Sequence, residues 1–235
     1  MEFDCKFLFF IPEGGGLMSN DITVYLFQTA SQQPKDVSQA AHSFVRRHIA
    51  QITDRDPDRL VFGRTKQGKP YAQNAGICFN LSHSGNMVAA AFAECEIGVD
   101  IEAVRPVNLR IAEGYFTESD RRYLAQAVDE QERRYRFFAL WTAKEAYLKL
   151  HGAGLSGGLG FSVAEERGLL TTVVSERFPA AEVFHRFISG ERFGTDSGCD
   201  AVCSLVQYSL SLCSDRINNV IFEHDDLTNE KSFYS

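Results

Sequence analysis

The chain has 235 residues, of which 44% are hydrophobic and 23% are charged, and these proportions are typical of a globular protein with a sizeable core. Its formal net charge of −7 argues against nucleic-acid binding, because neutralising phosphates requires a basic surface. No apolar run approaches the roughly 20 residues that cross a bilayer. We therefore expect no membrane-spanning segment.

The first twenty residues do not have the pattern of a signal peptide. Their apolar run at 7–11 is short and follows two acidic residues, whereas a signal peptide has a basic start and a longer apolar region. Three glycines at 14–16 then interrupt the chain. We expect residues 1–20 to be a disordered or mis-started extension, and either Met1 or Met18 is the true start.

The cysteines contain no CxxC pair and no histidine at the spacing of a zinc site. Cys199 and Cys203 are four residues apart, and we interpret them as small buried hydrophobic residues rather than metal ligands. The simplest interpretation of all the cysteines is reduced thiols in a cytoplasm.

Two elements are predicted at the start of the chain. β-branched and aromatic residues over 22–27 predict a strand. Apolar residues at helical spacing predict a helix over 37–52, which carries Arg46 and Arg47. Taken alone, these arginines are interpreted as solvated surface residues.

Polar side chains gather at the end of a buried strand predicted over 77–81. They are Asn80, Ser82 and His83. A serine hydrolase is one interpretation, but adjacent residues of an extended chain point apart, so Ser82 cannot readily use His83 as its base. The sequence also lacks the G-x-S-x-G motif. We therefore discount a serine hydrolase.

The stretch 97–102 alternates apolar and acidic residues and follows an apolar run at 87–93. This pattern predicts a hairpin, with Asp100 and Glu102 on the same face of its second strand. Neighbouring carboxylates repel unless a cation lies between them, and oxygen ligands suit Mg²⁺ better than Zn²⁺. The alternative is an ordinary half-exposed edge strand. A glycosidase is disfavoured, because carboxylates this close in sequence cannot flank a sugar from opposite sides.

A long helix is predicted over 130–149, ended by Gly152. On this helix Glu145 lies in line with an apolar stripe formed by Phe138, Trp141 and Leu148. An unpaired charge in such a stripe is costly. Either an ion pair with Lys149, one turn away, or a metal shared with the two strand carboxylates would satisfy Glu145.

The remaining segments predict a second group of elements. A helix is expected to begin after Thr117, whose hydroxyl is a favourable cap, and the glycine-rich loop at 152–160 lacks the order of a P-loop. Further strands are predicted over 169–174, 183–187 and 201–212. We accordingly divide the chain into a first α/β lobe over 21–114, a second α/β lobe over 115–222 and an acidic tail over 223–235.

Several stretches together resemble the 4′-phosphopantetheinyl transferases of the large monomeric, surfactin-synthetase-activating type. Two of them are similar to the signature motifs of that family: Gly98-Val99-Asp100-Ile101-Glu102 and Trp141-Thr142-Ala143-Lys144-Glu145-Ala146-Tyr147-Leu148-Lys149. Two more are similar to its coenzyme A-contacting segments: Gly68-Lys69-Pro70 and Phe79-Asn80-Leu81-Ser82-His83-Ser84. The resemblance covers about residues 41–162 and is weaker up to about 210.

The resemblance implies an α/β fold that is a pseudo-dimer of two similar lobes, each a small antiparallel sheet packed with helices. The active site would lie in the cleft between the lobes. It also implies that Mg²⁺, or Mn²⁺, is held by Asp100, Glu102 and Glu145, with Glu145 and Lys149 as catalytic residues. The implied coenzyme A contacts are Arg46, Gly68, Lys69, Pro70, Asn80, Ser82, His83, Lys144 and Lys149.

The implied reaction transfers 4′-phosphopantetheine from coenzyme A to a serine of an apo acyl, polyketide or peptidyl carrier protein and releases 3′,5′-ADP. The implied protein is a cytoplasmic monomer that binds neither nucleic acid nor membrane. One feature departs from the family, because Lys35 is the sole cation in 28–36, where further basic residues are expected. A non-catalytic module of this fold that binds coenzyme A or a carrier protein is therefore kept as the alternative.

Overall fold

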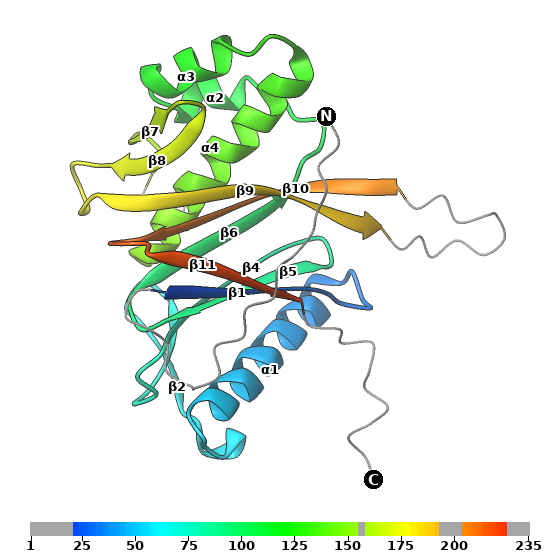
Figure 1. Ribbon diagram of the computed structural model, residues 1–235, viewed down its shortest axis with the longest axis vertical. Helices are drawn as coiled ribbons and strands as arrows, with labels where there is room; N and C mark the ends of the chain where they lie inside the picture. The colour runs from blue at the N-terminus through cyan, green and yellow to red at the C-terminus, as the bar shows by residue number, and fades with distance from the viewer. Residues whose placement is uncertain (1–20, 155–157, 193–203, 225–235) are drawn as a thin grey trace, which may run out of the picture.

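The structure is a computed structural model that describes residues 21–154, 158–192 and 204–224. The predicted extension at 1–20, Cys199 and Cys203 lie outside the described residues. Two sheets lie face to face with helices on their outer sides, so the elements form four layers (Figure 1). The mixed α/β class, with small sheets packed against helices, is therefore confirmed.

The first sheet has four strands and the second has five. In spatial order the first contains β11 (Asn219–His224), β1 (Asp21–Gln28), β5 (Met87–Ala93) and β4 (Cys78–Ser84). The second contains β6 (Ile97–Ala103), β10 (Ser204–Ser214), β9 (Ala181–Arg192), β8 (Leu169–Val174) and β7 (Ser162–Glu166). A separate hairpin is formed by β2 (Phe62–Arg64) and β3 (Pro70–Ala72).

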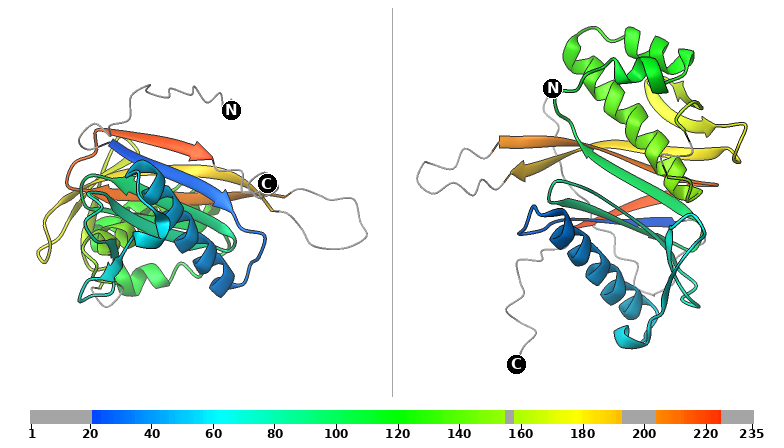
Figure 2. Two further views of the ribbon diagram at one scale, coloured as in Figure 1. Left: turned by 90° about the horizontal axis from the view of Figure 1, so that it is seen from below. Right: turned by 180° about the vertical axis from the view of Figure 1, so that it is seen from behind.

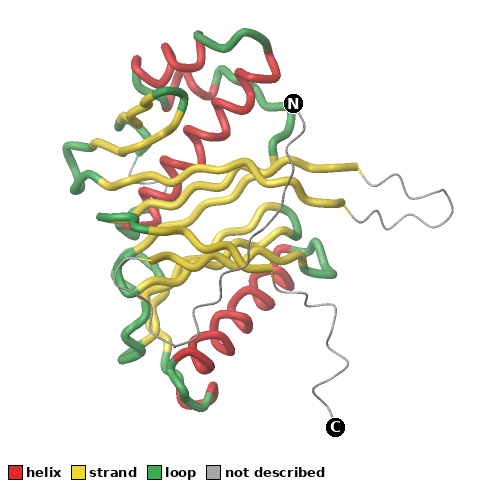
Figure 3. The backbone as a smooth tube through the Cα atoms, viewed as in Figure 1, coloured by secondary structure: helices red, strands yellow, loops and turns green. Residues whose placement is uncertain are grey.

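The helices cover the outer faces of the two sheets, as the secondary-structure colouring of Figure 3 shows. The first sheet is covered by α1 (Pro34–Ile52), and the second by α4 (Glu130–Leu150). Two short helices, α2 (Ile111–Tyr115) and α3 (Glu118–Ala125), lie beside α4, and a 3₁₀ turn, η1 (Pro57–Arg59), follows α1. None of the described helices combines the length and apolar character needed to cross a membrane.

Three apolar cores separate the layers, and burying them drives the layers together. The first core lies between α1 and the four-stranded sheet and includes Phe44 and Phe92. The second lies between the two sheets and includes Val99 and Leu210, and the third lies under α4. The view from behind in Figure 2 shows the same order of layers.

The predicted hairpin over 87–102 is wrong. β5 pairs with β1 and β4 in the first sheet, whereas β6 pairs with β10 in the second. All seven residues of β5 are buried, because it lies between α1 on one face and the second sheet on the other. The short connection after β5 therefore carries the chain from one sheet to the other.

The chain also crosses back at its far end, where β11 pairs in parallel with β1. Consequently β6, which precedes the predicted lobe boundary at 114, shares a sheet with strands that follow this boundary. The division at 114 and the likeness of the two lobes stay predictions. The predicted tail begins too early, because Glu223 and His224 belong to β11, while 225–235 lie outside the described residues.

Candidate active site

The strand β6 presents its two carboxylates to α4. Val99 and Ile101 are fully buried in the core between the sheets, and alternation turns Asp100 and Glu102 toward the opposite face. Gly98 lies on that same face, where a Cβ would collide with the backbone oxygen of Ala146 on α4. Glycine at this position therefore permits the close approach of strand and helix that brings Glu145 within electrostatic range of the carboxylates.

Asp100 is the centre of this group and is only 4% exposed. Its Oδ1 accepts hydrogen bonds from Ser82 Oγ at 2.8 Å and from Lys149 Nζ at 2.7 Å. Among the described residues, its buried Oδ2 has no hydrogen-bond partner. A buried carboxylate oxygen without a partner is costly, and a bound cation or donor would relieve that cost.

The surroundings of the two neighbouring carboxyl groups, Glu145 and Glu102, favour their protonated forms. Burial raises the pKa of Glu145 to about 7, and the charge of Asp100 adds to this effect, while Lys149 opposes it. Burial, followed by the charge of Asp100, also raises the pKa of Glu102. One lysine beside three carboxyl groups leaves excess negative charge, which favours a cation at this position.

Within the described ranges, no three His, Cys, Asp or Glu side chains approach closely enough to hold a metal ion. The predicted ligands Asp100, Glu102 and Glu145 are therefore not assembled as a coordination sphere, and Lys149 lies against Asp100 instead. Their chemistry nevertheless fits a hard divalent cation, because all are oxygen donors and Asp100 Oδ2 lacks a partner. Metal binding remains a proposal.

The edge strands β4 and β6 are joined by hydrogen bonds between β4 side chains and the β6 backbone, and not by backbone–backbone pairing. Alternate residues of β4 point at β6 and accept hydrogen bonds from its backbone. The bonds run from Val99 N to Asn80 Oδ1 at 2.9 Å, from Ile101 N to Ser82 Oγ at 3.3 Å and from Ala103 N to Ser84 Oγ at 3.0 Å.

The same hydroxyl groups position the carboxylates. Ser82 donates to Asp100, and Ser84 Oγ donates to Glu102 Oε2 at 2.9 Å. Each serine therefore accepts a bond from the β6 backbone and donates one to a β6 side chain. We call this arrangement of Asn80, Ser82 and Ser84 the β4 seam.

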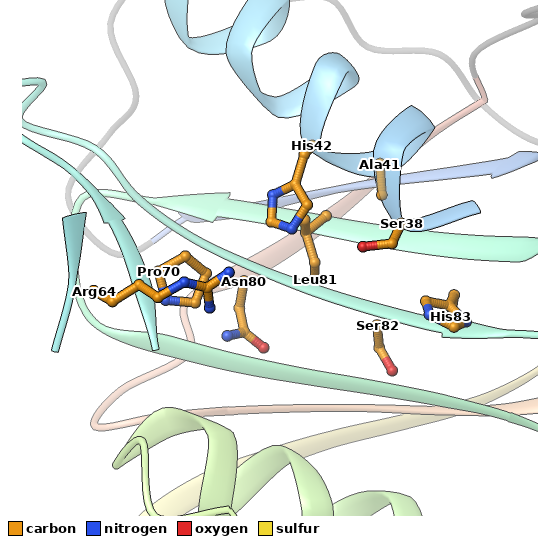
Figure 4. Close-up of a pocket in the computed structure, with 9 residues that line it drawn as sticks. All are labelled: Ser38, Ala41, His42, Arg64, Pro70, Asn80, Leu81, Ser82 and His83. Atoms are coloured by element: carbon orange, nitrogen blue, oxygen red, sulfur yellow. The ribbon is translucent and has the colours of Figure 1, made fainter. Parts of the chain in front are cut away.

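A cavity of 220 Å³ lies along β4, beneath α1. Four predicted coenzyme A contacts line it: Pro70, Asn80, Ser82 and His83. Its other lining residues are Ser38, Ala41, His42, Arg64 and Leu81, and Figure 4 shows them converging from α1, β4 and the β2–β3 hairpin. Because Ser82 both lines the cavity and binds Asp100, the cavity lies next to the carboxylates.

Sequence reasoning did not find Ser38, His42 and Arg64. Ser38 and His42 are one helical turn apart on α1, so a common face for them could have been read from their spacing. Arg64 lies in a three-residue strand whose position over the cavity depends on the packing of the hairpin, and no local pattern indicates it.

Comparison with known proteins identifies the segment that carries the carboxylates. Residues 96–194 match the family described as the 4′-phosphopantetheinyl transferase superfamily. The matched segment is less than half of the chain. It contains β6 and α4, and with them Asp100, Glu102 and Glu145, whereas α1 and β4 precede it.

Individual transferases are similar over part of the chain. The 4′-phosphopantetheinyl transferase psf-1 of Bacillus pumilus is 40% identical over 103 residues, which are 43% of this chain and 44% of that protein. The transferase Sfp of Bacillus subtilis (strain 168) is 36% identical over 113 residues, 48% and 50% of the two chains. The transferase gsp of Aneurinibacillus migulanus is 32% identical over 111 residues, which are 47% of this chain and 46% of that protein. The chain thus spans about half the length of the curated relatives it matches.

Four basic residues predicted from the transferase resemblance to contact coenzyme A lie outside the cavity lining. Lys149 lies beside Asp100, and the other three have different partners. Lys69 Nζ donates to Glu96 Oε2 at 2.5 Å, to the carbonyl of Ile97 at 3.0 Å and to that of Leu150 at 2.9 Å. It therefore joins the start of β6 to the end of α4. Gly68, its neighbour, has φ +95 in the β2–β3 turn, a conformation that favours glycine.

Arg46 also has structural partners. Its Nη1 donates to the carbonyls of Pro57 at 2.6 Å and Leu60 at 3.0 Å, and its guanidinium lies over the ring of Phe62. These contacts fix the segment after α1. The structure does not bring Arg46 to the cavity.

Lys144 was predicted to contact a phosphate of coenzyme A, but its position in the structure does not fit that role. Its side chain is 0% exposed and forms an ion pair with Asp120 at 2.8 Å. It also donates to the carbonyls of Leu159 and Phe161. A lysine enclosed in this way cannot reach a substrate phosphate, because the apolar core around it would have to open.

Proposed function

We propose that this protein transfers 4′-phosphopantetheine from coenzyme A to a serine of an apo acyl, polyketide or peptidyl carrier protein. The observation that carries the proposal is the group of carboxyls around Asp100, with its unpartnered buried oxygen, inside the superfamily segment. The names of the similar proteins support the same activity.

The residues that would hold a divalent cation, Mg²⁺ or Mn²⁺, are Asp100, Glu102 and Glu145. Such a cation neutralises charge on phosphate oxygens. Lys149 Nζ, 2.7 Å from Asp100, lies where it can donate to a phosphate oxygen beside the carboxylates. Gly68, Pro70, Asn80, Ser82 and His83 are the proposed contacts to the rest of coenzyme A.

In the proposed reaction, the carrier serine Oγ forms a bond to the β-phosphorus of coenzyme A. The bond from that phosphorus to the bridging oxygen of 3′,5′-ADP breaks, and the diphosphate oxygen leaves with the electron pair. Glu145 accepts the hydroxyl proton, directly or through a bound water, because its carboxyl lies beside Asp100, where the attacking serine and the phosphate would meet. Lys149 stabilises the charge that develops on the leaving phosphate.

The setting of this activity is part of the proposal. We propose a cytoplasmic monomer whose substrates meet in the cleft between two lobes. The cavity beneath α1 would take the nucleotide part of coenzyme A, and the carrier serine would approach the carboxylates from the open side of Lys149, whose side chain is 29% exposed.

The proposal is tested by the intact mass of an apo carrier protein after incubation with this protein, coenzyme A and Mg²⁺. We expect a gain of one phosphopantetheine, and no gain when EDTA is present. Carriers from fatty-acid, polyketide and peptide synthesis would be tested in parallel. No gain on any of them, with a folded protein, would contradict the transferase proposal and favour the non-catalytic binding module.

A further inference from the structure

Three hydroxyl groups meet in the mainly apolar interface between α4 and the second sheet. Thr142 of α4 is 0% exposed, and so are Ser209 and Ser211 of β10. The Oγ1 of Thr142 lies 3.0 Å from Ser209 Oγ and 2.8 Å from Ser211 Oγ. The core beside them contains apolar residues such as Phe138 and Ala143. Polar groups buried in such a core are costly unless they are hydrogen-bonded, so their arrangement is constrained.

The hydrogen-bonding capacity of these groups fixes the direction of each bond. Thr142 Oγ1 donates to the carbonyl of Phe138 at 2.9 Å, one helical turn back, and therefore accepts from both serine hydroxyls. Ser209 then accepts from the Nε2 of His185, which lies 3.0 Å away. Burial lowers the pKa of His185 to about 4, so its ring is neutral and carries its hydrogen on Nε2. Thr142, Ser209, Ser211 and His185 thus form one connected network.

The network lies next to the carboxylates, on the same face of the sheet. In the antiparallel pairing of β10 with β6, Ser211 is opposite Asp100 and Ser209 is opposite Glu102. Residues directly opposed in an antiparallel pair project from the same face, with their Cβ atoms about 5 Å apart. The two hydroxyls that bind Thr142 therefore come from the positions beside two of the proposed metal ligands.

Two contacts of α4 with the sheet lie on either side of Glu145. Three residues before it, Thr142 is hydrogen-bonded to β10, and one residue after it, the backbone of Ala146 lies against Gly98 of β6. The contact at Gly98 sets how closely the helix approaches, but apolar packing has no directional preference. Hydrogen bonds do have one, so the bonds of Thr142 fix α4 along and around its axis.

We propose that Thr142 is a positioning residue whose hydroxyl, bound to Ser209 and Ser211, holds Glu145 in place relative to the carboxylates of β6. The inference rests on the proposed function and adds to it a residue that does not contact the substrates. Lys149 is also on α4, so a shift of the helix would displace both functional side chains together. A displacement of about 1 Å can lower a rate by about a hundredfold.

Thr142→Val keeps the shape of the side chain and removes its hydroxyl, so it tests this role. Transfer to an apo carrier protein would be followed by mass at varied coenzyme A concentration, and binding of Mn²⁺ alone by electron paramagnetic resonance. We expect kcat to fall and Mn²⁺ binding to weaken, each about tenfold to a hundredfold. The KM for coenzyme A should be unchanged, because the cavity beneath α1 belongs to the other sheet. Thr142→Ser keeps the hydroxyl and should restore both values.

Ser214→Ala is the matched control. Ser214 is a 0% exposed serine of the same strand, and its Oγ donates to the carbonyl of Glu96 at 3.0 Å. It is opposite Ile97, at the end of β6 that is farther from Glu102. Its loss should lower the unfolding midpoint, as Thr142→Val does, and leave kcat and Mn²⁺ binding unchanged.

A second variant keeps the inference testable if Thr142→Val does not fold. Ser211→Ala removes one of the two bonds to Thr142 and should change kcat and Mn²⁺ binding in the same direction by a smaller factor. Normal kcat and Mn²⁺ binding in folded Thr142→Val would overturn the positioning role, and so would equal losses in Ser214→Ala.

Failure of the inference and failure of the proposed function give different results. If the wild-type protein transfers phosphopantetheine, the kcat values of the variants decide the role of Thr142. If it binds Mn²⁺ but transfers nothing, the transferase proposal falls and the Mn²⁺ affinities decide. If it neither binds Mn²⁺ nor transfers, both fall.

Discussion

Two ion pairs on α4 show opposite ways of burying charge. Lys144 pairs with Asp120, both side chains are 0% exposed, and Asp120 also accepts hydrogen bonds from Thr117 and Val163. Lys149 pairs with Asp100, but this lysine is partly exposed and Asp100 keeps a buried oxygen without a described partner. We call the fully buried Lys144–Asp120 pair the closed pair and the partly exposed Lys149–Asp100 pair the open pair.

The difference separates a structural site from a chemical one. In the closed pair the neighbours are backbone carbonyls, the backbone N–H of Val163, the helix cap Thr117 and aromatic rings, including Phe161 at 4.7 Å from Lys144 Nζ. In the open pair the neighbours are two more carboxyl groups with raised pKa values. Carboxyl groups with shifted pKa values next to a buried oxygen that has no hydrogen-bond partner are typical of a functional site.

The largest effect is expected at Glu145, in the open region. Glu145→Gln should lower the transfer rate by about 10²–10⁴, the usual contribution of a general base, and should leave the unfolding midpoint close to that of the wild type. The measurement is the rate of mass gain of the carrier protein. Glu130→Gln, at the exposed start of the same helix, is the control and should be as active as the wild type. Near-normal transfer by Glu145→Gln would remove Glu145 from the mechanism.

The next effect concerns the closed pair. Asp120→Asn should lower the free energy of unfolding by about 3–5 kcal/mol, because it leaves a buried lysine without its counter-charge. Urea denaturation measures this loss. Glu118→Gln breaks the exposed pair with Arg122 and should cost less than about 1 kcal/mol. A loss of activity without a loss of stability in Asp120→Asn would contradict the structural role of this pair.

The β4 seam should give an intermediate effect on both properties. Ser84→Ala removes the acceptor of the Ala103 N–H and the donor to Glu102, and should cost about 1–3 kcal/mol of stability. It should also raise the Mg²⁺ concentration needed for half-maximal transfer, because Glu102 loses its positioning bond. Ser84→Thr keeps the hydroxyl and should restore both properties. An unchanged Mg²⁺ requirement in Ser84→Ala would show that the seam does not position Glu102.

The smallest effect concerns two histidines that are neutral in the folded protein. Because acid favours their protonated forms, they lower the stability of the fold as the pH falls. Burial lowers the pKa of His48 to about 4 among Tyr25 and Phe92, and that of His185 to about 4 beside Ser209. Between about pH 6.5 and 4 the unfolded chain binds protons that the folded chain does not, so stability falls as the pH falls. Their contribution is complete above about pH 6.5.

Denaturation curves at pH 7 and pH 5 measure this difference. His48→Gln and His185→Gln should each show a smaller loss between the two pH values than the wild type. The comparison is His42, which is exposed, so His42→Gln should change the pH dependence of stability least. If the pH dependence of stability were unchanged in both His48→Gln and His185→Gln, these histidines would not be neutral in the folded protein.

The sequence predicted the elements better than their partners. The long helix over 130–149 is confirmed as α4, Thr117 is confirmed as a helix cap, and the strand over 169–174 is confirmed as β8. Alternation correctly gives the face of Asp100, because a strand has period two. It cannot tell which strand lies beside it, so the connection after β5 was interpreted as a hairpin.

The missed features depend on contacts between distant residues. The pairing of Asp21 with Asn219 joins positions 198 residues apart, and no local pattern indicates it. The seam depends on two sheet edges meeting. Lys144 and Lys149 look alike in sequence, and their roles are separated by tertiary contacts, such as the ion pair with Asp120 and the packing of Phe161 against Lys144.

The most direct test of this account is transfer by Lys144→Met and Lys149→Met, measured per folded molecule by carrier-protein mass. We expect Lys149→Met to remain folded and to lose transfer. Lys144→Met should be destabilised, while its folded fraction still transfers. Loss of transfer in fully folded Lys144→Met, or normal transfer in Lys149→Met, would contradict the assignment of the closed pair to structure and the open pair to chemistry.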